Sequence, residues 1–403
     1  MSFHETKLEN GLTVIGEHHK ASQCAAIGFF VKTGSRDETP EIAGVSHFLE
    51  HMMFKGTAKR SALDITYQLA AIGAQSNAYT NEENTVYYVY VLPEYFDTAF
   101  EILSDMLRPA LDENEFNTEK KVILEEIALY EDRPTFKLYE AAMREYFYNH
   151  PAGNSVLGTT ETVGGISVGQ MRRYFDSRYS PENITLSVSG QFDWERVCEL
   201  SDIHCGHWDR HDADREVKPH MPTAREKILT KENLQMSHMC LMGEGPAAGD
   251  DMRYAAYVLA CILGDSTGSR TYWELVDKGL AEGAAVDSED MDGVGMVYSF
   301  VSARPEALDD VGEILQKIMR TPMEFSDDDL ERAKTKIATR LVLQGESSMR
   351  RLMAIGVDWT YRQQYHSIES ELKRLQSVSR KEIESMLAHY SFTPTTKVKM
   401  VPA

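Results

Sequence analysis

The apolar residues of the first half switch between strand-like and helix-like spacing. Residues 8–19 hold two β-rich runs around an Asn-Gly turn, and residues 24–35 form a mostly apolar run that ends near a glycine. In residues 75–93 the β-formers alternate on either side of a polar turn, which predicts strand, turn, strand. These runs indicate an antiparallel sheet.

Helical periodicity lies between and after these strands. Apolar residues recur every three to four positions in four segments, and Gly73 stops the second of them as a C-cap. The segments are 44–54, 62–73, 95–108 and 112–130. A last apolar run at 183–190 predicts a strand that closes this half.

The second half repeats this order of elements. Strands are expected at 238–244 and 296–303, and helices at 253–264, 306–319 and 326–344. A similar order in both halves predicts an internal duplication. The expected fold is α+β with two homologous halves, each an antiparallel sheet with helices packed on one face. The expected domains are 1–206, a polar, proline-containing linker at 207–225, and 226–403.

Charge and composition narrow the class of protein. The 403 residues carry a formal charge of −21, which repels nucleic acid and anionic membranes and favours cationic or neutral partners. No apolar run is long enough to span a membrane, and the first twenty residues do not resemble a secretory signal, so we expect a cytoplasmic protein. Five scattered cysteines indicate reduced thiols rather than disulfides.

The segment GVSHFLEHMMFKGT carries the first candidate chemistry. His47, Glu50 and His51 lie on one face of a helix, because positions i, i+3 and i+4 share a face. Two imidazoles one turn apart can bind one Zn²⁺, and the glutamate beside them can act as a general base. This is the inverted H-x-x-E-H arrangement. The alternative is a surface helix with two chance histidines.

A catalytic zinc needs a third protein ligand. The helix predicted at 112–130 is rich in carboxylates, and Glu119 and Glu126 lie two helical turns apart on one face. Glu126 could bind the metal while Glu119 supports a ligand or the water. The alternative for this helix is a solvated, charged face. The donor set also does not distinguish zinc from another divalent ion.

Three motifs in order resemble one known family. The segments GVSHFLEHMMFKGT, GAQSNAYTNEENTVYY and KKVILEEIALYEDRP are similar to those of the pitrilysin-type inverted zinc metallopeptidases, in particular the bacterial single-chain members similar to the β subunit of mitochondrial processing peptidase. The resemblance implies one Zn²⁺ bound by His47, His51 and Glu126, with Glu50 as general base and Glu119 supporting catalysis. It implies a metalloendopeptidase.

The resemblance also assigns roles outside the metal site. Asn77 and Ala78 correspond to the edge strand where the family adds an extended substrate, although an ordinary strand residue explains them equally well. In active relatives the second half supplies an arginine and a tyrosine that contact the substrate. Here Glu282 stands in the tyrosine position. Either Arg270 or Tyr272 takes over part of the role, or a partner subunit does, or the enzyme is slower or narrower than its relatives.

The second half corresponds to the family's inactive repeat. A shift of about 214 residues sets Cys261, Gly264 and Asp265 opposite His47, Glu50 and His51, and Arg340 opposite Glu126. We therefore expect no zinc in the second half.

The expected function is zinc-dependent hydrolysis of peptides or unfolded segments, with basic peptides favoured by the acidic chain. A family chamber of four such halves implies a homodimer, or a heterodimer with a partner chain. The competing hypothesis is a non-catalytic or partner-dependent subunit of a processing-peptidase-like assembly.

Overall fold

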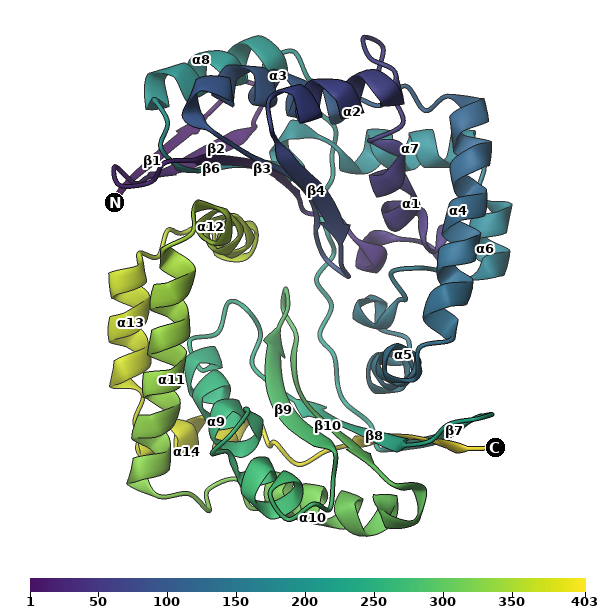
Figure 1. The fold of residues 1–403 in the computed structure, drawn as a ribbon, viewed down its shortest axis with the longest axis vertical. Helices are drawn as coiled ribbons and strands as arrows, with labels where there is room; N and C mark the ends of the chain where they lie inside the picture. Colours follow the sequence, from purple (N-terminus) through teal and green to yellow (C-terminus); the bar gives the residue numbers. More distant parts are fainter. The chain divides into compact units, whose positions relative to one another are not determined.

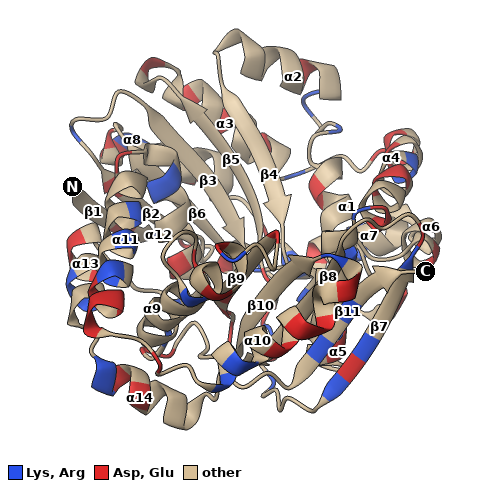
Figure 2. Cartoon of the chain, turned by 60° about the horizontal axis from the view of Figure 1, so that its bottom comes forward, with Lys and Arg blue, Asp and Glu red and all other residues tan.

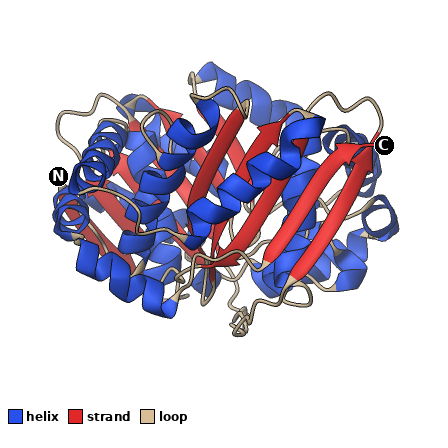
Figure 3. Cartoon of the chain, turned by 90° about the horizontal axis from the view of Figure 1, so that it is seen from below, coloured by secondary structure: helices blue, strands red, loops and turns tan.

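The computed structural model describes all 403 residues and divides them into two compact units. The first unit comprises Met1–Ala128, Asn154–Glu216 and Leu343–Tyr365, and the second comprises Leu129–Gly153, Val217–Val342 and His366–Ala403. Each unit consists of one sheet and its helices (Figure 1, Figure 3), which confirms the predicted fold class. Residues 206–224 carry no helix or strand, and the predicted domain bounds stay a prediction.

The sheet of the first unit has six strands. Their order is β1 (Ser2–Lys7), β2 (Thr13–His18), β6 (Ile184–Gly190), β3 (Ala25–Val31), β5 (Thr85–Val91) and β4 (Gln75–Thr80). All neighbours are antiparallel except β2 and β6, which run parallel. The strand β4 lies at the edge of the sheet, next to β5 alone.

Helices cover both faces of this sheet. Successive side chains of a strand point to opposite faces. Phe29 of β3 meets Phe100 of α3 (Phe96–Met106) at 6.4 Å between ring centroids, while Phe30 packs with Leu352 of α12 (Ser348–Arg362). Figure 1 shows α3 and α8 (Trp194–Cys205) on one side of the sheet and α12 on the other. The sequence predicted helices on one face only, and α12 is the addition.

Five further helices belong mainly to the first unit, and the first of them packs against β4. They are α1 (Val45–Met52), α2 (Ala62–Ala71), α4 (Glu113–Glu131), α6 (Thr160–Gly165) and α7 (Val168–Arg178). In α1 the apolar residues are buried, and Phe48 stacks on Phe116 of α4 at 4.6 Å between ring centroids. Gly73, with φ of 64°, follows α2 in the left-handed conformation expected of a C-cap.

The sheet of the second unit repeats the topology of the first. Its order is β7 (Arg225–Lys231), β11 (Thr396–Pro402), β8 (Ser237–Glu244), β10 (Gly295–Ala303) and β9 (Gly283–Asp290). The parallel pair β7–β11 matches β2–β6, and the other neighbours are antiparallel. The matching order supports the predicted duplication.

One face of the second sheet is covered by a helix from early in the sequence. Leu138, Ala142 and Met143 of α5 (Pro134–Phe147) pack on the sheet residues Met242 and Met296. The other helices of this unit are α9 (Arg253–Gly264), α10 (Leu308–Arg320), α11 (Asp327–Gly345), α13 (Ile368–Ser377) and α14 (Arg380–His389). None of the protein's helices is both long and apolar enough to cross a bilayer.

Candidate metal centre

The short helix α1 presents both predicted histidines on one side. Its apolar residues, among them Phe48 and Leu49, are fully buried and fix the helix against the rest of the unit. His47 is 8% exposed, while Glu50 and His51 are partly exposed. Figure 2 shows acidic residues on α1 and α4, the two helices that form the centre.

The helix α4 brings the third candidate ligand. Glu126 Oε2 lies 3.8 Å from His47 Nε2 and 3.6 Å from His51 Nε2, and one donor atom from each of the three residues lies within 4.8 Å of the others. Two ligand atoms on a tetrahedral zinc ion are about 3.4 Å apart at ordinary bond lengths. The spacing is too long for hydrogen bonds between these atoms and close to that of ligands around one ion, so the donor set fits Zn²⁺.

An outer carboxylate holds one histidine. His51 Nδ1 lies 2.9 Å from Glu119 Oε1, and Lys55 Nζ lies 2.6 Å from Glu119 Oε2. When His51 Nδ1 donates to Glu119, its Nε2 keeps a free lone pair that faces Glu126, as a metal ligand requires. Glu119 thus contacts a candidate ligand and lies outside the candidate donor set, and its supporting role stays a prediction.

Burial keeps the other histidine, His47, in its neutral form. Burial, followed by the neighbouring His51, lowers the pKa of His47 to about 3, so this imidazole is neutral at pH 7. Its Nδ1 is buried without a hydrogen-bond partner, in contrast to that of His51. A neutral imidazole is the form that binds metal.

Glu50 is held by the edge strand. The Thr80 hydroxyl donates to Glu50 Oε2 over 2.5 Å, at the end of β4. Burial raises the pKa of the Glu50 carboxyl; the hydrogen bond from Thr80 and the proximity of His51 oppose this rise, and Glu126 adds to it. A partly buried carboxyl with a raised pKa and no place in the candidate ligand set has the properties of a general base.

The predicted substrate residues Asn77 and Ala78 lie on the same edge strand. The side chain of Asn77 is exposed, and its Oδ1 accepts a hydrogen bond from the Ala78 N–H over 2.9 Å. The Ala78 N–H therefore bonds to a neighbouring side chain rather than to β5. Their role in substrate binding stays a prediction.

The predicted residues Arg270 and Tyr272 belong to the second unit. Arg270 donates to the Thr321 carbonyl over 2.5 Å and pairs with Glu324 at 3.2 Å. Tyr272 begins a π-helical turn and meets the ring of Trp273 edge-on. Arg270 thus has partners within its own unit, and the substrate-binding role of both residues stays a prediction.

The corresponding place in the second half holds an ion pair. Asp265, opposite His51, accepts from Arg340 over 2.6 Å and from Lys336 over 3.2 Å, and Cys261 lies 3.6 Å from the same carboxylate oxygen. At Gly264, opposite Glu50, a Cβ atom would lie 2.0 Å from the Val286 nitrogen. The side chains of Arg340 and Lys336 supply the positive charge here, and no glutamate can replace the glycine.

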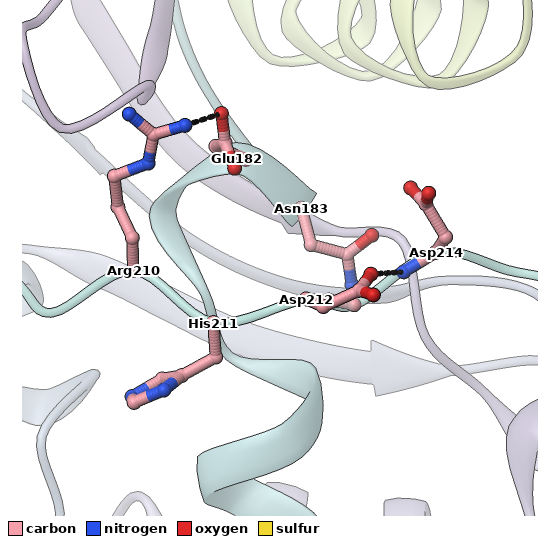
Figure 4. Close-up of a pocket in the computed structure, with 7 residues that line it drawn as sticks. Glu182, Asn183, Arg210, His211, Asp212 and Asp214 are labelled. Carbon is pink, nitrogen blue, oxygen red and sulfur yellow. Dashed lines mark hydrogen bonds and ion pairs between the residues drawn. The ribbon is translucent and has the colours of Figure 1, made fainter.

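A separate polar cavity of about 420 Å³ lies at the start of β6 (Figure 4). It shares no residue with the metal centre. Arg210 pairs with Glu182 at 2.5 Å, and Asp212 accepts from the Asp214 N–H over 3.3 Å. We assign this cavity no role.

Sequence patterns did not indicate every residue that contacts the centre. Thr80 lies in a predicted strand to which the sequence assigns no contact with the centre, and Lys55 lies one turn after His51, where i+4 spacing could have suggested it. The Thr80 contact joins a strand to a helix thirty residues earlier, and no local pattern encodes it.

Family models match both halves of the chain. The family described as insulinase (peptidase family M16) matches residues 13–160, and the M16 inactive domain matches residues 165–337. The chain is 31% identical to the uncharacterized zinc protease YmxG of Bacillus subtilis, over 96% of this chain and 94% of YmxG. It is 30% identical to an uncharacterized zinc protease of Mycobacterium leprae, over 95% and 88% of the two chains.

Solved structures share the fold. A protease from Helicobacter pylori superposes with a TM-score of 0.90 at 21% identity, covering 100% of this chain and 99% of that one. A protein described as a peptidase M16 inactive domain, from Pseudomonas fluorescens, gives a TM-score of 0.93 at 14% identity, with 100% and 99% covered.

Proposed function

Because the chain belongs to the insulinase (M16) family of peptidases, we propose that it is a zinc-dependent endopeptidase that hydrolyses peptides or unfolded segments bound in extended form. The observation that carries this proposal is the convergence of His47, His51 and Glu126 within 4.8 Å, with Glu50 beside them and outside the ligand set.

His47, His51 and Glu126 would hold one Zn²⁺ per chain. A bound zinc ion supplies a Lewis acid that polarises a carbonyl and lowers the pKa of water to about 7. Glu50 takes the proton of the attacking water and passes it to the leaving amine, which suits a carboxyl whose pKa is raised by burial. The Thr80 hydroxyl fixes the orientation of the Glu50 carboxyl during this transfer.

Glu119 acts through His51. Its carboxylate accepts from His51 Nδ1 and is itself held by Lys55, so the imidazole keeps one orientation and one tautomer. Glu119 is a positioning residue in this scheme, because its oxygens contact a ligand and a lysine rather than the reacting atoms.

The substrate would add to the free edge of β4 as a further strand. The Ala78 N–H then exchanges its partner, from Asn77 Oδ1 to a substrate carbonyl. Because Thr80 lies two residues further along the same strand, the edge that binds the peptide also orients the base.

The proposed partners are basic peptide substrates and a second copy of the chain. The charge of −21 favours basic peptides. A homodimer is proposed from the family resemblance, with a heterodimer as the alternative, and Arg270 and Tyr272 remain the candidates for substrate contacts from the second unit. The mass in solution decides between a homodimer and a single chain of 45.6 kDa.

Cleavage of a quenched-fluorescence peptide library tests the proposal. The purified chain should cleave at interior bonds, lose activity in chelator and regain it with added Zn²⁺. Activity that chelator leaves unchanged contradicts the zinc mechanism. A folded, zinc-loaded chain that cleaves nothing would instead favour the partner-dependent subunit, for which Glu282 at the family's tyrosine position is the specific observation.

A further inference from the structure

The helix that carries both histidines begins at a residue that cannot cap it. Gly44 takes the N-cap position with φ of 92°, and it provides no side-chain hydrogen bond. A Cβ atom at this position would lie 2.7 Å from the Leu157 carbonyl oxygen, so no larger residue fits without a shift of the backbone. Helix N-termini leave N–H groups unpaired, and a helix of eight residues is not stable alone.

Glu38 satisfies these N–H groups from six residues upstream. Its Oε2 accepts from the Gly44 N–H and its Oε1 from the Ser46 N–H, each over 2.7 Å. The residue is only 7% exposed, so both bonds form away from water. A carboxylate at the start of a helix also interacts favourably with the helix dipole. One buried side chain thus caps the helix by accepting hydrogen bonds from two backbone N–H groups.

A second chain of hydrogen bonds fixes the same turn. The Ser46 hydroxyl lies 2.6 Å from the Tyr174 hydroxyl, which lies 2.9 Å from Thr33 Oγ1. Arg178 Nε donates to the same Thr33 oxygen over 3.2 Å. Ser46, Tyr174 and Thr33 are all buried. The turn directly before His47 is therefore tied to α7 and to the end of β3.

The rotation of α1 determines where both imidazoles lie. An imidazole nitrogen stands about 6 Å from the helix axis, so a rotation of about 10° moves it by about 1 Å. Functional sites tolerate displacements of about 0.5 Å. A loosened first turn would therefore disturb the spacing between the His47 and His51 nitrogens and Glu126.

We propose that Glu38 is a positioning residue for the metal centre, which sets the start and rotation of α1 through Gly44 and Ser46, with Ser46 and Tyr174 as its second anchor. This inference rests on the proposed zinc site and extends it to residues whose side chains contact neither the ligand side chains nor the reacting atoms. Without Glu38, the ligands remain in the chain but are held less firmly for metal.

Zinc affinity of the full chain tests the proposal directly. Glu38→Gln keeps one acceptor oxygen and loses the other, so we expect it to bind Zn²⁺ roughly tenfold more weakly in competition with a chromophoric chelator. Asp64→Asn is the matched control, because Asp64 bonds to the Ser61 N–H at the start of α2, away from the centre. The control should bind zinc as the wild type does. After Co²⁺ substitution, the absorption bands of Glu38→Gln should differ from those of the wild type, and the bands of Asp64→Asn should not.

Tyr174→Phe provides a milder variant should Glu38→Gln fail to fold. It removes one hydroxyl and keeps the buried ring, and we expect about threefold weaker zinc binding. Unchanged affinity in a folded Glu38→Gln protein overturns the proposal, as does unchanged affinity in Tyr174→Phe where Glu38→Gln does not fold. A wild-type chain that binds no zinc overturns both this proposal and the proposed function. Zinc binding without peptide cleavage overturns the proposed function alone.

Discussion

At the scale of single residues, the two histidines of the centre are held in different ways. His51 is fixed from behind by the Glu119 carboxylate, which Lys55 also contacts. His47 has no such partner at its Nδ1 and is fixed by burial. Glu119 and Lys55 therefore act on His51 and not on His47. Substituting Glu119 tests this contact alone.

Glu119→Gln should weaken Zn²⁺ binding by about tenfold or more, because removing an outer carboxylate from a ligating histidine typically costs 10- to 100-fold in affinity. Chelator competition on the purified chain measures this. Glu125→Gln is the control, since Glu125 is exposed on the same helix. Equal affinities of the Glu119 variant and the wild type would contradict the role assigned to Glu119.

Thr80 should act on the rate rather than on binding. Thr80→Val removes the 2.5 Å hydrogen bond to Glu50 and leaves the strand intact, so we expect kcat to fall about tenfold with KM unchanged. Thr80→Ser keeps a hydroxyl and should restore most of the rate. A loss of activity that comes only from a raised KM, or no recovery with serine, would show that Thr80 serves the strand and not the base.

The candidate ligands and Glu119 could be proposed from the sequence, whereas Glu38 and Thr80 could not. His47 and His51 are one turn apart and Glu119 and Glu126 two turns apart, so helical spacing alone placed each pair on one face. The contacts of Glu38 and Thr80 join segments with no shared periodicity. Such hydrogen bonds follow from the packing of the elements and leave no local pattern.

At the scale of elements, periodicity predicted the strands and helices that carry the candidate site, but it predicted neither α5 nor α12. The helices α5 and α12 hold equivalent places in the two halves, and each is assigned to the unit formed mainly by the other half. An amphipathic pattern predicts that a helix buries one face. It does not predict which sheet that face packs against. The strand β3, apolar at almost every position, was the one indication that its sheet is covered on both faces.

The start of α1 should make stability depend on pH. Burial raises the pKa of Glu38 to about 7, opposed in part by hydrogen bonds from Ser46 and Gly44. The folded state therefore binds this proton more tightly than the unfolded state does. The free energy of unfolding should fall as the pH rises from about 4.5 to about 7, by up to about 3 kcal/mol from this group.

Urea denaturation in chelator at pH 5 and pH 7.5 checks this expectation. Glu38→Gln has no carboxyl at this position, so its unfolding free energy should change less between the two pH values than that of the wild type. Equal changes in the two proteins would show that the carboxyl of Glu38 titrates alike in the folded and unfolded states.

At the scale of the whole molecule, the net charge of −21 is the feature that bears on substrate choice. An acidic protein concentrates basic peptides near its surface, and salt screens this attraction. Raising NaCl from about 50 to about 300 mM should increase KM for a basic peptide several-fold and leave KM for a neutral peptide of the same length unchanged. If KM for the basic peptide does not change with salt, charge does not determine substrate choice.

The most direct test of the central claim compares wild type with Glu50→Gln, both loaded with zinc and both assayed on the same quenched peptide. The account predicts one zinc ion per chain in each protein, because Glu50 lies outside the ligand set, and cleavage by the wild type alone. Cleavage by Glu50→Gln at the wild-type rate would contradict the account. So would loss of zinc from that variant, which would make Glu50 a ligand and leave the centre without its base.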